Sequence, residues 1–142
     1  RDPPALFACG EYDLVFSNPP YRSVTSGALS MGARAAARHE LTATLADTVH
    51  AASYALRHGG RLAMVHLPER LGEIVLAVHA EHLAIKRLRM VQPRADKAPN
   101  LMLIEAAKGA ALTGMRHEPA LIVRDVEGRY TDEICSIYGQ EM

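Results

Sequence analysis

The chain has 142 residues, of which 49% are hydrophobic, so it is long enough to bury one sizeable core. Its formal net charge is +0 and its pI is about 7.2, which excludes a strongly basic nucleic-acid-binding domain but leaves room for a local basic patch. No run reaches the ~18 apolar residues of a membrane span and no signal peptide is visible, so we expect a cytoplasmic protein without a membrane partner.

The predicted elements alternate between strands and helices along the chain. Residues 12–17 are predicted to form a short buried strand, and the Ser/Thr/Gly-rich residues 22–30 a loop over its end. Residues 40–57 carry apolar side chains at helical spacing, and Gly59 follows as a stop signal. The later elements are a strand at 61–67, a helix at 68–81, strands at 83–91, 101–106 and 120–124, a turn at 127–128 and a helix at 131–138. This alternation predicts an α/β fold with a mostly parallel, twisted sheet.

The most informative segment is Asn18-Pro19-Pro20-Tyr21, directly after the first predicted strand. Each proline fixes its own φ and lacks an N–H, so the strand must end in a rigid corner. Asn-Pro and Pro-Pro are also ordinary turn dipeptides, in which case the tyrosine caps a core. The position at the carboxyl end of a strand favours a binding site, because open α/β sheets bind their ligands there.

Such a corner suits a planar group that carries an amine. The amine of a base or an amide is a poor nucleophile because its lone pair is delocalised. The Asn18 side-chain carbonyl and the Pro19 backbone carbonyl could each accept one amine hydrogen and so free that lone pair. Tyr21 would stack on the ring, which contributes roughly 1–3 kcal/mol per base. Catalysis of this type depends on positioning and electrostatics and needs no covalent intermediate.

Residues 13–21, Asp-Leu-Val-Phe-Ser-Asn-Pro-Pro-Tyr, resemble motif IV of the amino-group methyltransferases, which use S-adenosylmethionine. DNA and RNA adenine methyltransferases and the enzymes that methylate a release-factor glutamine share this motif. Further segments narrow the resemblance to the bacterial tRNA1(Val) adenine-N6-methyltransferase family. These segments are residues 37–40, 58–65, 97–101, 105–106, 128–133 and 137–139. The similarity therefore covers nearly all of the chain.

The resemblance implies the C-terminal half of a Rossmann-like class I methyltransferase sheet, mostly parallel with an antiparallel final strand. No glycine-rich loop follows a strand, and Gly59-Gly60 stands in the wrong order for a nucleotide-binding turn. We therefore expect residues 1–142 to be the C-terminal part of one methyltransferase domain, without its N-terminal donor-binding part. The chain alone should bind the cofactor S-adenosylmethionine poorly, with Asn18 as its expected contact.

The function that the resemblance implies is N6-methylation of an adenine in tRNA, with Asn18, Pro19, Pro20 and Tyr21 as the catalytic residues. Methylation of a DNA adenine or of a protein glutamine stays open, because the corner alone does not separate these amino groups. A further alternative is an inactive truncated or interaction module that keeps the fold but cannot bind the donor.

Other polar residues are weaker candidates for substrate binding. Arg38 and His39 begin the long predicted helix, either as its N-terminus or as contacts to substrate RNA. Lys97 and Asn100 lie in the loop before the strand at 101–106, which by resemblance approaches the active site. The densest basic stretch is either a solvated strand edge and loop or a contact to tRNA phosphates. This stretch comprises Lys86, Arg87, Arg89, Arg94 and Lys97.

The edge of the first strand and the two cysteines bear on protein partners and on metal ions. In the resembling fold the strand at 12–17 pairs with a strand of the first half, so here it would be an open edge. We expect the chain to self-associate through this edge or to be part of a larger protein. The two cysteines, Cys9 and Cys135, match no metal or redox spacing, so we expect buried or free thiols in a reducing cytoplasm and no metal site.

Overall fold

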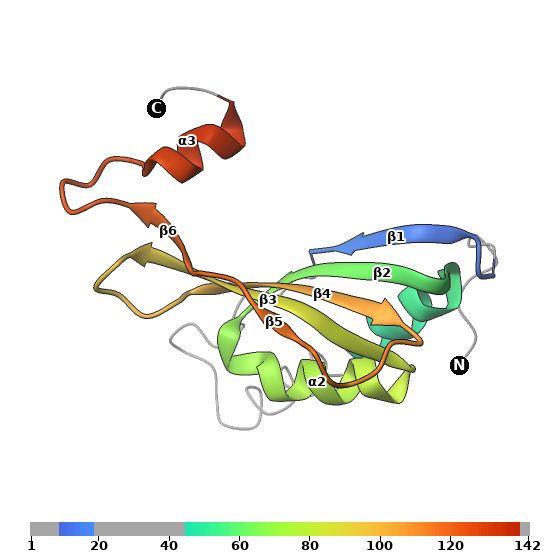
Figure 1. Cartoon of the computed structure of the whole chain (residues 1–142). Coiled ribbons are helices and arrows are strands. Elements are labelled where there is room, and N and C mark those ends of the chain that lie inside the picture. The colour runs from blue at the N-terminus through green and yellow to red at the C-terminus, as the bar shows by residue number, and fades with distance from the viewer. Residues whose placement is uncertain (1–8, 19–44, 140–142) are drawn as a thin grey trace, which may run out of the picture.

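The computed structural model describes residues 9–18 and 45–139. Figure 1 shows a curved sheet with helices packed against it, which confirms the predicted α/β class. The first elements are β1 (Tyr12–Ser17), a helix at residues 45–55, β2 (Leu56–His66), the 3-10 helix η1 (Pro68–Arg70) and α2 (Leu71–Ala80). The later elements are β3 (Leu83–Arg94), β4 (Leu101–Lys108), β5 (Arg116–His117), β6 (Leu121–Arg124) and α3 (Asp132–Tyr138).

The strands follow the order β1-β2-β4-β3-β5, and β6 also pairs with β3. β1 runs parallel to β2, and both β5 and β6 run parallel to β3. β4 is antiparallel to β2 and β3, between which it lies. The short loop at residues 95–100 imposes this direction, because a connection of that length joins only antiparallel neighbours. The antiparallel strand implied by the resemblance is therefore β4, and it lies inside the sheet.

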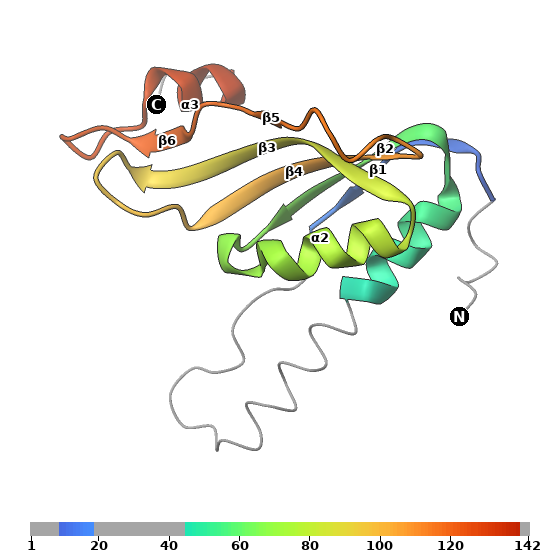
Figure 2. The same cartoon turned by 60° about the horizontal axis from the view of Figure 1, so that its bottom comes forward.

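The main core lies on one face of the sheet. Figure 2 shows the helix at 45–55 and α2 on this face, with α3 on the opposite face near the end of β3. Alternate residues of β2 and β4 are buried, as expected for strands with one face against helices. Those in the core include Leu62, Met64, Met102 and Ile104, which form one cluster with Val49, Leu56, Ile74 and Val78. Complete burial of one such side chain stabilises the fold by roughly 1.5–3 kcal/mol.

A second, smaller apolar cluster holds the C-terminal elements on β3. Val91, Leu121 and Ile134 are buried together, one each from β3, β6 and α3. The Thr131 hydroxyl begins α3, because it accepts the N–H of Ile134 (3.4 Å) and donates to the Ile122 carbonyl (2.7 Å). The last strand and helix are thus attached to the sheet by both packing and capping.

The helix at 45–55 ends two residues earlier than the prediction that it extends to residue 57. The ammonium of Lys108, at the end of β4, donates to the carbonyls of Ser53 (2.6 Å) and Leu56 (2.8 Å). These carbonyls are the acceptors that a helix end leaves unsatisfied, so a side chain distant in sequence terminates the helix. The predicted start at residue 40 lies outside the described residues.

β2 begins at Leu56, so the two glycines predicted to precede the strand lie inside it. The pairing with β1 shifts here, from Tyr12 opposite Leu56 to Leu14 opposite Arg61. Gly59 has a φ of 83°, and a Cβ on Gly60 would lie 3.0 Å from the Tyr12 carbonyl oxygen. Only glycines permit this tight passage, so a pattern that resembles a stop signal is a strand irregularity.

β1 is more exposed than the buried strand that we predicted. It stands at the end of the strand order, and in the described part of the chain it pairs with β2 alone. Leu14 is 60% exposed and Phe16 is 64% exposed, whereas Val15 packs against the main core. The apolar composition of β1 therefore suits a strand covered on both faces, but the described residues cover only one.

Candidate active site at the carboxyl edge of the sheet

Asn18 follows the last paired residue of β1 and is exposed. Ser17 lies opposite Met64 of the parallel strand β2, so Asn18 stands at the carboxyl edge of the sheet. This edge is where open α/β sheets bind ligands, which agrees with the position that we predicted. The other predicted residues of the corner, Pro19, Pro20 and Tyr21, lie outside the described residues. The same applies to Arg38 and His39.

The loop that carries Lys97 and Asn100 lies at the same edge of the sheet. β4 is antiparallel, so its first residues stand beside the last residues of β2 and β3, with Met102 opposite His66 and Leu101 opposite Val91. The Asn100 N–H donates to the Val91 carbonyl at 3.0 Å. Both predicted residues are exposed, but β2 separates them from β1. Two strand spacings correspond to about 10 Å, so they share an edge with Asn18 without direct contact.

His66 is a polar residue at this edge that we did not single out from the sequence. It ends β2, is 3% exposed, and accepts the N–H of Leu67 on Nδ1 at 2.9 Å. Burial and the neighbouring Arg70 charge lower its pKa, against the opposing effect of Glu73. The lowered pKa favours the neutral ring, whose proton is then on Nε2 because Nδ1 accepts a hydrogen bond. A lone histidine at the end of an apolar run, before Leu67-Pro68, is the only signal that the sequence offers.

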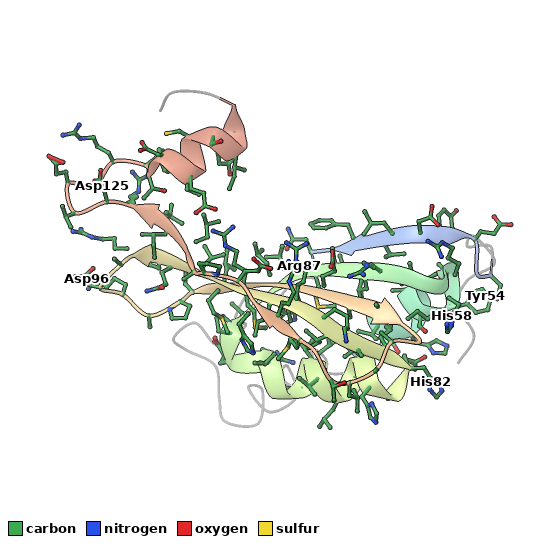
Figure 3. The ribbon with its side chains drawn as sticks, viewed as in Figure 1. Tyr54, His58, His82, Arg87, Asp96 and Asp125 are labelled. Carbon is green, nitrogen blue, oxygen red and sulfur yellow. The ribbon has the colours of Figure 1, made fainter. Side chains whose placement is uncertain are left out.

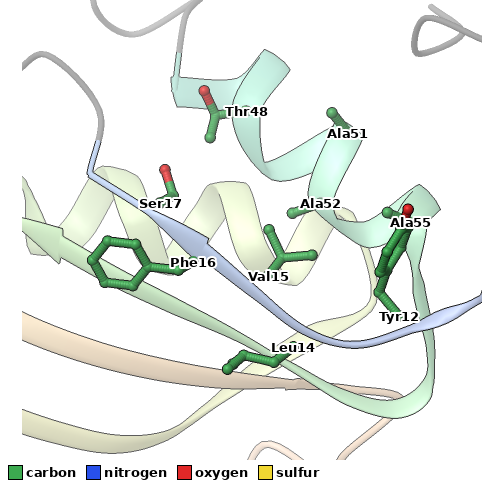
Figure 4. Close-up of a pocket in the computed structure, with 9 residues that line it drawn as sticks. All are labelled: Tyr12, Leu14, Val15, Phe16, Ser17, Thr48, Ala51, Ala52 and Ala55. Carbon is green, nitrogen blue, oxygen red and sulfur yellow. The ribbon is translucent and has the colours of Figure 1, made fainter. Parts of the chain in front are cut away.

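An apolar cavity of about 480 Å³ lies between β1 and the helix at 45–55. Figure 4 shows small side chains on the helix facing β1, which leaves the space unfilled. Among the described residues no charged group lines the cavity, so this part of it suits apolar side chains or an uncharged ring. It reaches Ser17, the residue before Asn18. Its lining residues are Tyr12, Leu14, Val15, Phe16, Ser17, Thr48, Ala51, Ala52 and Ala55.

The basic stretch of β3 mainly holds other parts of the chain. Lys86 donates to the carbonyls of Ala111 (2.9 Å) and Thr113 (2.6 Å), and Arg89 donates to the Pro119 carbonyl (2.8 Å). These bonds attach the segment around β5 to the outer edge of β3. The two predicted roles, a solvated edge and a phosphate contact, therefore do not describe Lys86 or Arg89.

Arg87 belongs to a row of alternating charges on the sheet face opposite α2, near the centre of Figure 3. It lies 3.7 Å from Glu105 and 3.5 Å from Glu118, and these carboxylates also pair with Arg61 (2.7 Å) and Arg116 (2.9 Å). The hydrogen bond from Arg116 is the main reason that the pKa of Glu118 lies below its usual value. Exposed pairs of this kind contribute little to stability, because solvent screens them. Each arginine of this row thus has a glutamate partner within the chain, so ion pairs account for the whole row.

No three His, Cys, Asp or Glu side chains of the described residues gather as metal ligands would. Cys9 and Cys135 are both free thiols, the first exposed and the second half-buried. Within residues 9–18 and 45–139, no helix is long and apolar enough to cross a membrane.

No protein-family model matches the chain. It is 33% identical over 132 residues to a tRNA1(Val) (adenine(37)-N6)-methyltransferase of Tolumonas auensis, covering 92% of this chain and 54% of that protein. It is 31% identical over 130 residues to the protein of the same name from Porphyromonas gingivalis, covering 91% and 51%. The chain thus spans about half the length of the curated relatives that it matches.

Two solved structures share the fold. A predicted O-methyltransferase from Agrobacterium tumefaciens superposes with a TM-score of 0.70 at 20% identity, over 92% of this chain and 52% of that chain. A candidate DNA modification methylase from Thermus thermophilus, complexed with S-adenosyl-L-methionine, superposes with a TM-score of 0.56 at 15% identity, over 75% and 49%. The expected methyltransferase sheet is therefore confirmed at the level of the fold.

Proposed function

Since curated homologues that match 89–92% of the chain are tRNA1(Val) (adenine(37)-N6)-methyltransferases, we propose that it carries the acceptor side of an S-adenosylmethionine-dependent methyltransferase. The substrate in this proposal is an adenine of tRNA, and the reaction transfers a methyl group to its N6 amine in the cytoplasm. The observation that carries the proposal is the position of Asn18, one residue beyond β1 at the carboxyl edge of the sheet.

The chemistry assigned to this chain is the orientation of an amine. In the proposal, the Asn18 side-chain oxygen and the Pro19 carbonyl each accept one hydrogen of the adenine amine, while Tyr21 stacks on the base. With its lone pair freed, the amine would form the new N–CH3 bond as the S–CH3 bond of the donor breaks and the neutral thioether product leaves. The methylated amine would then lose its extra proton to solvent, so no general base is required. The target adenine must leave its stack to reach this corner.

The described residues do not fit a complete site for the methyl donor. A bound S-adenosylmethionine would supply the methyl group, but within residues 9–18 and 45–139 no carboxylate suited to its ribose hydroxyls lines the cavity beside β1. Asn18 is the one contact that we assign to the donor. We therefore treat residues 1–142 as the C-terminal part of one methyltransferase domain, with the donor site completed by further polypeptide.

The exposed side of β1 supports this division. No other described strand pairs with its outer backbone, and that backbone and the side chains of Leu14 and Phe16 are suited to pairing with another strand. In a longer protein that strand would come from the donor-binding part. For the 142-residue chain alone, the proposal is self-association through the same edge.

The function is tested by replacing Asn18 in the methyltransferase that carries this chain. Asn18→Ala removes one acceptor and should abolish methyl transfer to tRNA, while calorimetry shows donor binding close to that of the unaltered protein. Asn18→Asp retains an acceptor oxygen of the same shape and should retain more turnover than Asn18→Ala. Undiminished turnover by Asn18→Ala removes this residue from the mechanism. A DNA adenine substrate and a glutamine peptide, assayed in parallel, test the other amino groups.

A further inference from the structure

A second cavity, of about 520 Å³, lies at the same carboxyl edge, beyond the loop of Lys97 and Asn100. One wall is the turn after β3, and the other is the turn between β6 and α3. Figure 3 places Asp96 and Asp125 on these two turns, at the end of the molecule away from Tyr54 and His58. Unlike the cavity beside β1, this one is lined by charged groups. Its residues are Arg94, Ala95, Asp96, Ile122, Arg124, Asp125, Val126 and Thr131.

Two guanidinium groups are held in place at this cavity. Arg94 Nη2 donates to the Val126 carbonyl at 3.1 Å, which links the two turns. Arg124 Nη1 donates to the Gly128 carbonyl at 2.8 Å, and its guanidinium lies 4.1 Å from the centre of the Tyr130 ring. A guanidinium has five N–H donors in a planar fork, so each of these bonds leaves further donors for a ligand. Stacking and hydrogen bonding also reduce the entropy that each side chain would lose on binding.

The two carboxylates at the cavity differ in the hydrogen bonds and ion pairs that they already make. Asp125 Oδ1 accepts the backbone N–H groups of Glu127 (2.9 Å) and Arg129 (3.0 Å), so it is occupied in shaping the turn. Asp96 Oδ1 lies 3.9 Å from Arg94 Nε, a loose pair whose carboxylate side chain is 76% exposed. A phosphodiester of an RNA strand carries a full negative charge on two non-bridging oxygens, and it can compete with such a loose pair.

We propose that this cavity binds a phosphate and its nucleoside from the tRNA strand at a distance from the target adenine. The proposal rests on the proposed function, which supplies RNA as the partner. Two fixed guanidiniums suit a phosphate, and the apolar side chains of Ile122 and Val126 provide a wall for a sugar or base. The volume lies within the range of ordinary small-ligand sites. β6 is four strand positions from β1, or roughly 19 Å, so the nucleotide bound here is not the one that is methylated.

The test uses the purified methyltransferase that carries this chain. Fluorescence anisotropy measures its binding of a fluorescein-labelled tRNA anticodon stem–loop at several salt concentrations. Arg94→Gln and Arg124→Gln should each weaken binding by about tenfold and reduce the salt slope by about one. Arg124→Lys keeps the charge but loses the planar fork, so its affinity should fall between those of the unaltered protein and Arg124→Gln. In turnover assays the glutamine variants should raise KM for tRNA with kcat unchanged.

Arg129→Gln is the matched control, because Arg129 lies on the same turn, is 71% exposed and pairs with Glu127 outside the cavity lining. It should bind like the unaltered protein. Equal weakening by Arg129→Gln, or unchanged binding by both cavity variants at equal melting temperatures, overturns the assignment. If the unaltered protein binds no tRNA, the proposed function and this inference fail together. If it binds and methylates tRNA while the cavity variants behave normally, only the cavity assignment fails.

Discussion

The two long edges of the sheet are finished in different ways. On the outer side of β3, the chain returns as β5 and β6, and three basic side chains bond to backbone carbonyls of the returning segment. A separate apolar cluster then packs against the end of β3. On the outer side of β1, no strand pairs with it among the described residues, and Leu14 and Phe16 are exposed. The first edge is complete within the chain, whereas the second has the composition of a strand that another element covers.

The largest expected effect concerns the completed edge. Leu121, in β6, is 7% exposed and packs with Val91 and Ile134, so Leu121→Ala should destabilise the protein by about 2–4 kcal/mol. Urea denaturation measures this loss. Val126→Ala serves as the control, since Val126 is 83% exposed and its truncation should change stability by less than about 0.5 kcal/mol. Equal effects of the two substitutions would show that β6 does not pack as described.

A smaller effect is expected where β1 joins β2. A Cβ on Gly60 would lie 2.9 Å from the Arg57 carbonyl oxygen and 3.0 Å from that of Tyr12, so Gly60→Ala must displace one strand. We expect a loss of about 1–3 kcal/mol and faster amide hydrogen exchange in β1 than in β6. Gly72→Ala is the matched control, because it lies in α2 with open space around it and should stabilise the helix by up to about 1 kcal/mol. Unchanged exchange in β1 for Gly60→Ala would contradict the close pairing of Tyr12 with the start of β2.

The smallest effect on folding, and the sharpest test of the uncovered edge, comes from Phe16→Lys. Phe16 is 64% exposed, so the substitution should leave stability within about 0.5 kcal/mol of the original value. A lysine on an edge strand opposes pairing with another chain. Light scattering should therefore give masses above 15.5 kDa that rise with concentration for the 142-residue chain, and the monomer mass for the variant. A chain that stays monomeric at high concentration rules out self-association through β1.

Local patterns predicted the elements well. The apolar run before Asn18 and the prolines after it predicted both β1 and the end of the strand, because each signal is confined to a few residues. The start of β2 was wrong, since the irregularity at Gly59 and Gly60 depends on pairing with Tyr12, which is distant in the sequence. β5 has only two residues and no alternation of its own, so no local pattern could reveal it.

Prediction of the candidate site is limited in the same way, because some of its contacts join residues that are distant in the sequence. The sequence predicted that Asn18 follows the end of a strand, which is confirmed, whereas its role in a site stays a prediction. The resemblance implied that the loop of Lys97 and Asn100 approaches the active site, and this also stays a prediction. The sequence did not reveal that Lys86 and Arg89 are bonded to carbonyls 25 to 30 residues further along the chain. Nor did it reveal the cavity of Arg94 and Arg124, because the strand and turn that form it meet only through the parallel pairing of β6 with β3. Side chains whose partners are distant in sequence need the tertiary structure for their roles to be assigned.

In the proposed mechanism, the position of Asn18 makes methyl transfer depend on what pairs with β1. Asn18 directly follows β1, whose outer edge no described residue pairs with, so in the proposed mechanism a partner that holds β1 against β2 would also orient the acceptor oxygen. By mass action, a partner that binds only the ordered form of β1 raises the population of chains with a correctly placed Asn18. Methyl-transfer activity should then rise as the partner occupies the β1 edge, along the same saturation curve as partner binding. The turnover rate would therefore measure the affinity of the chain for that partner.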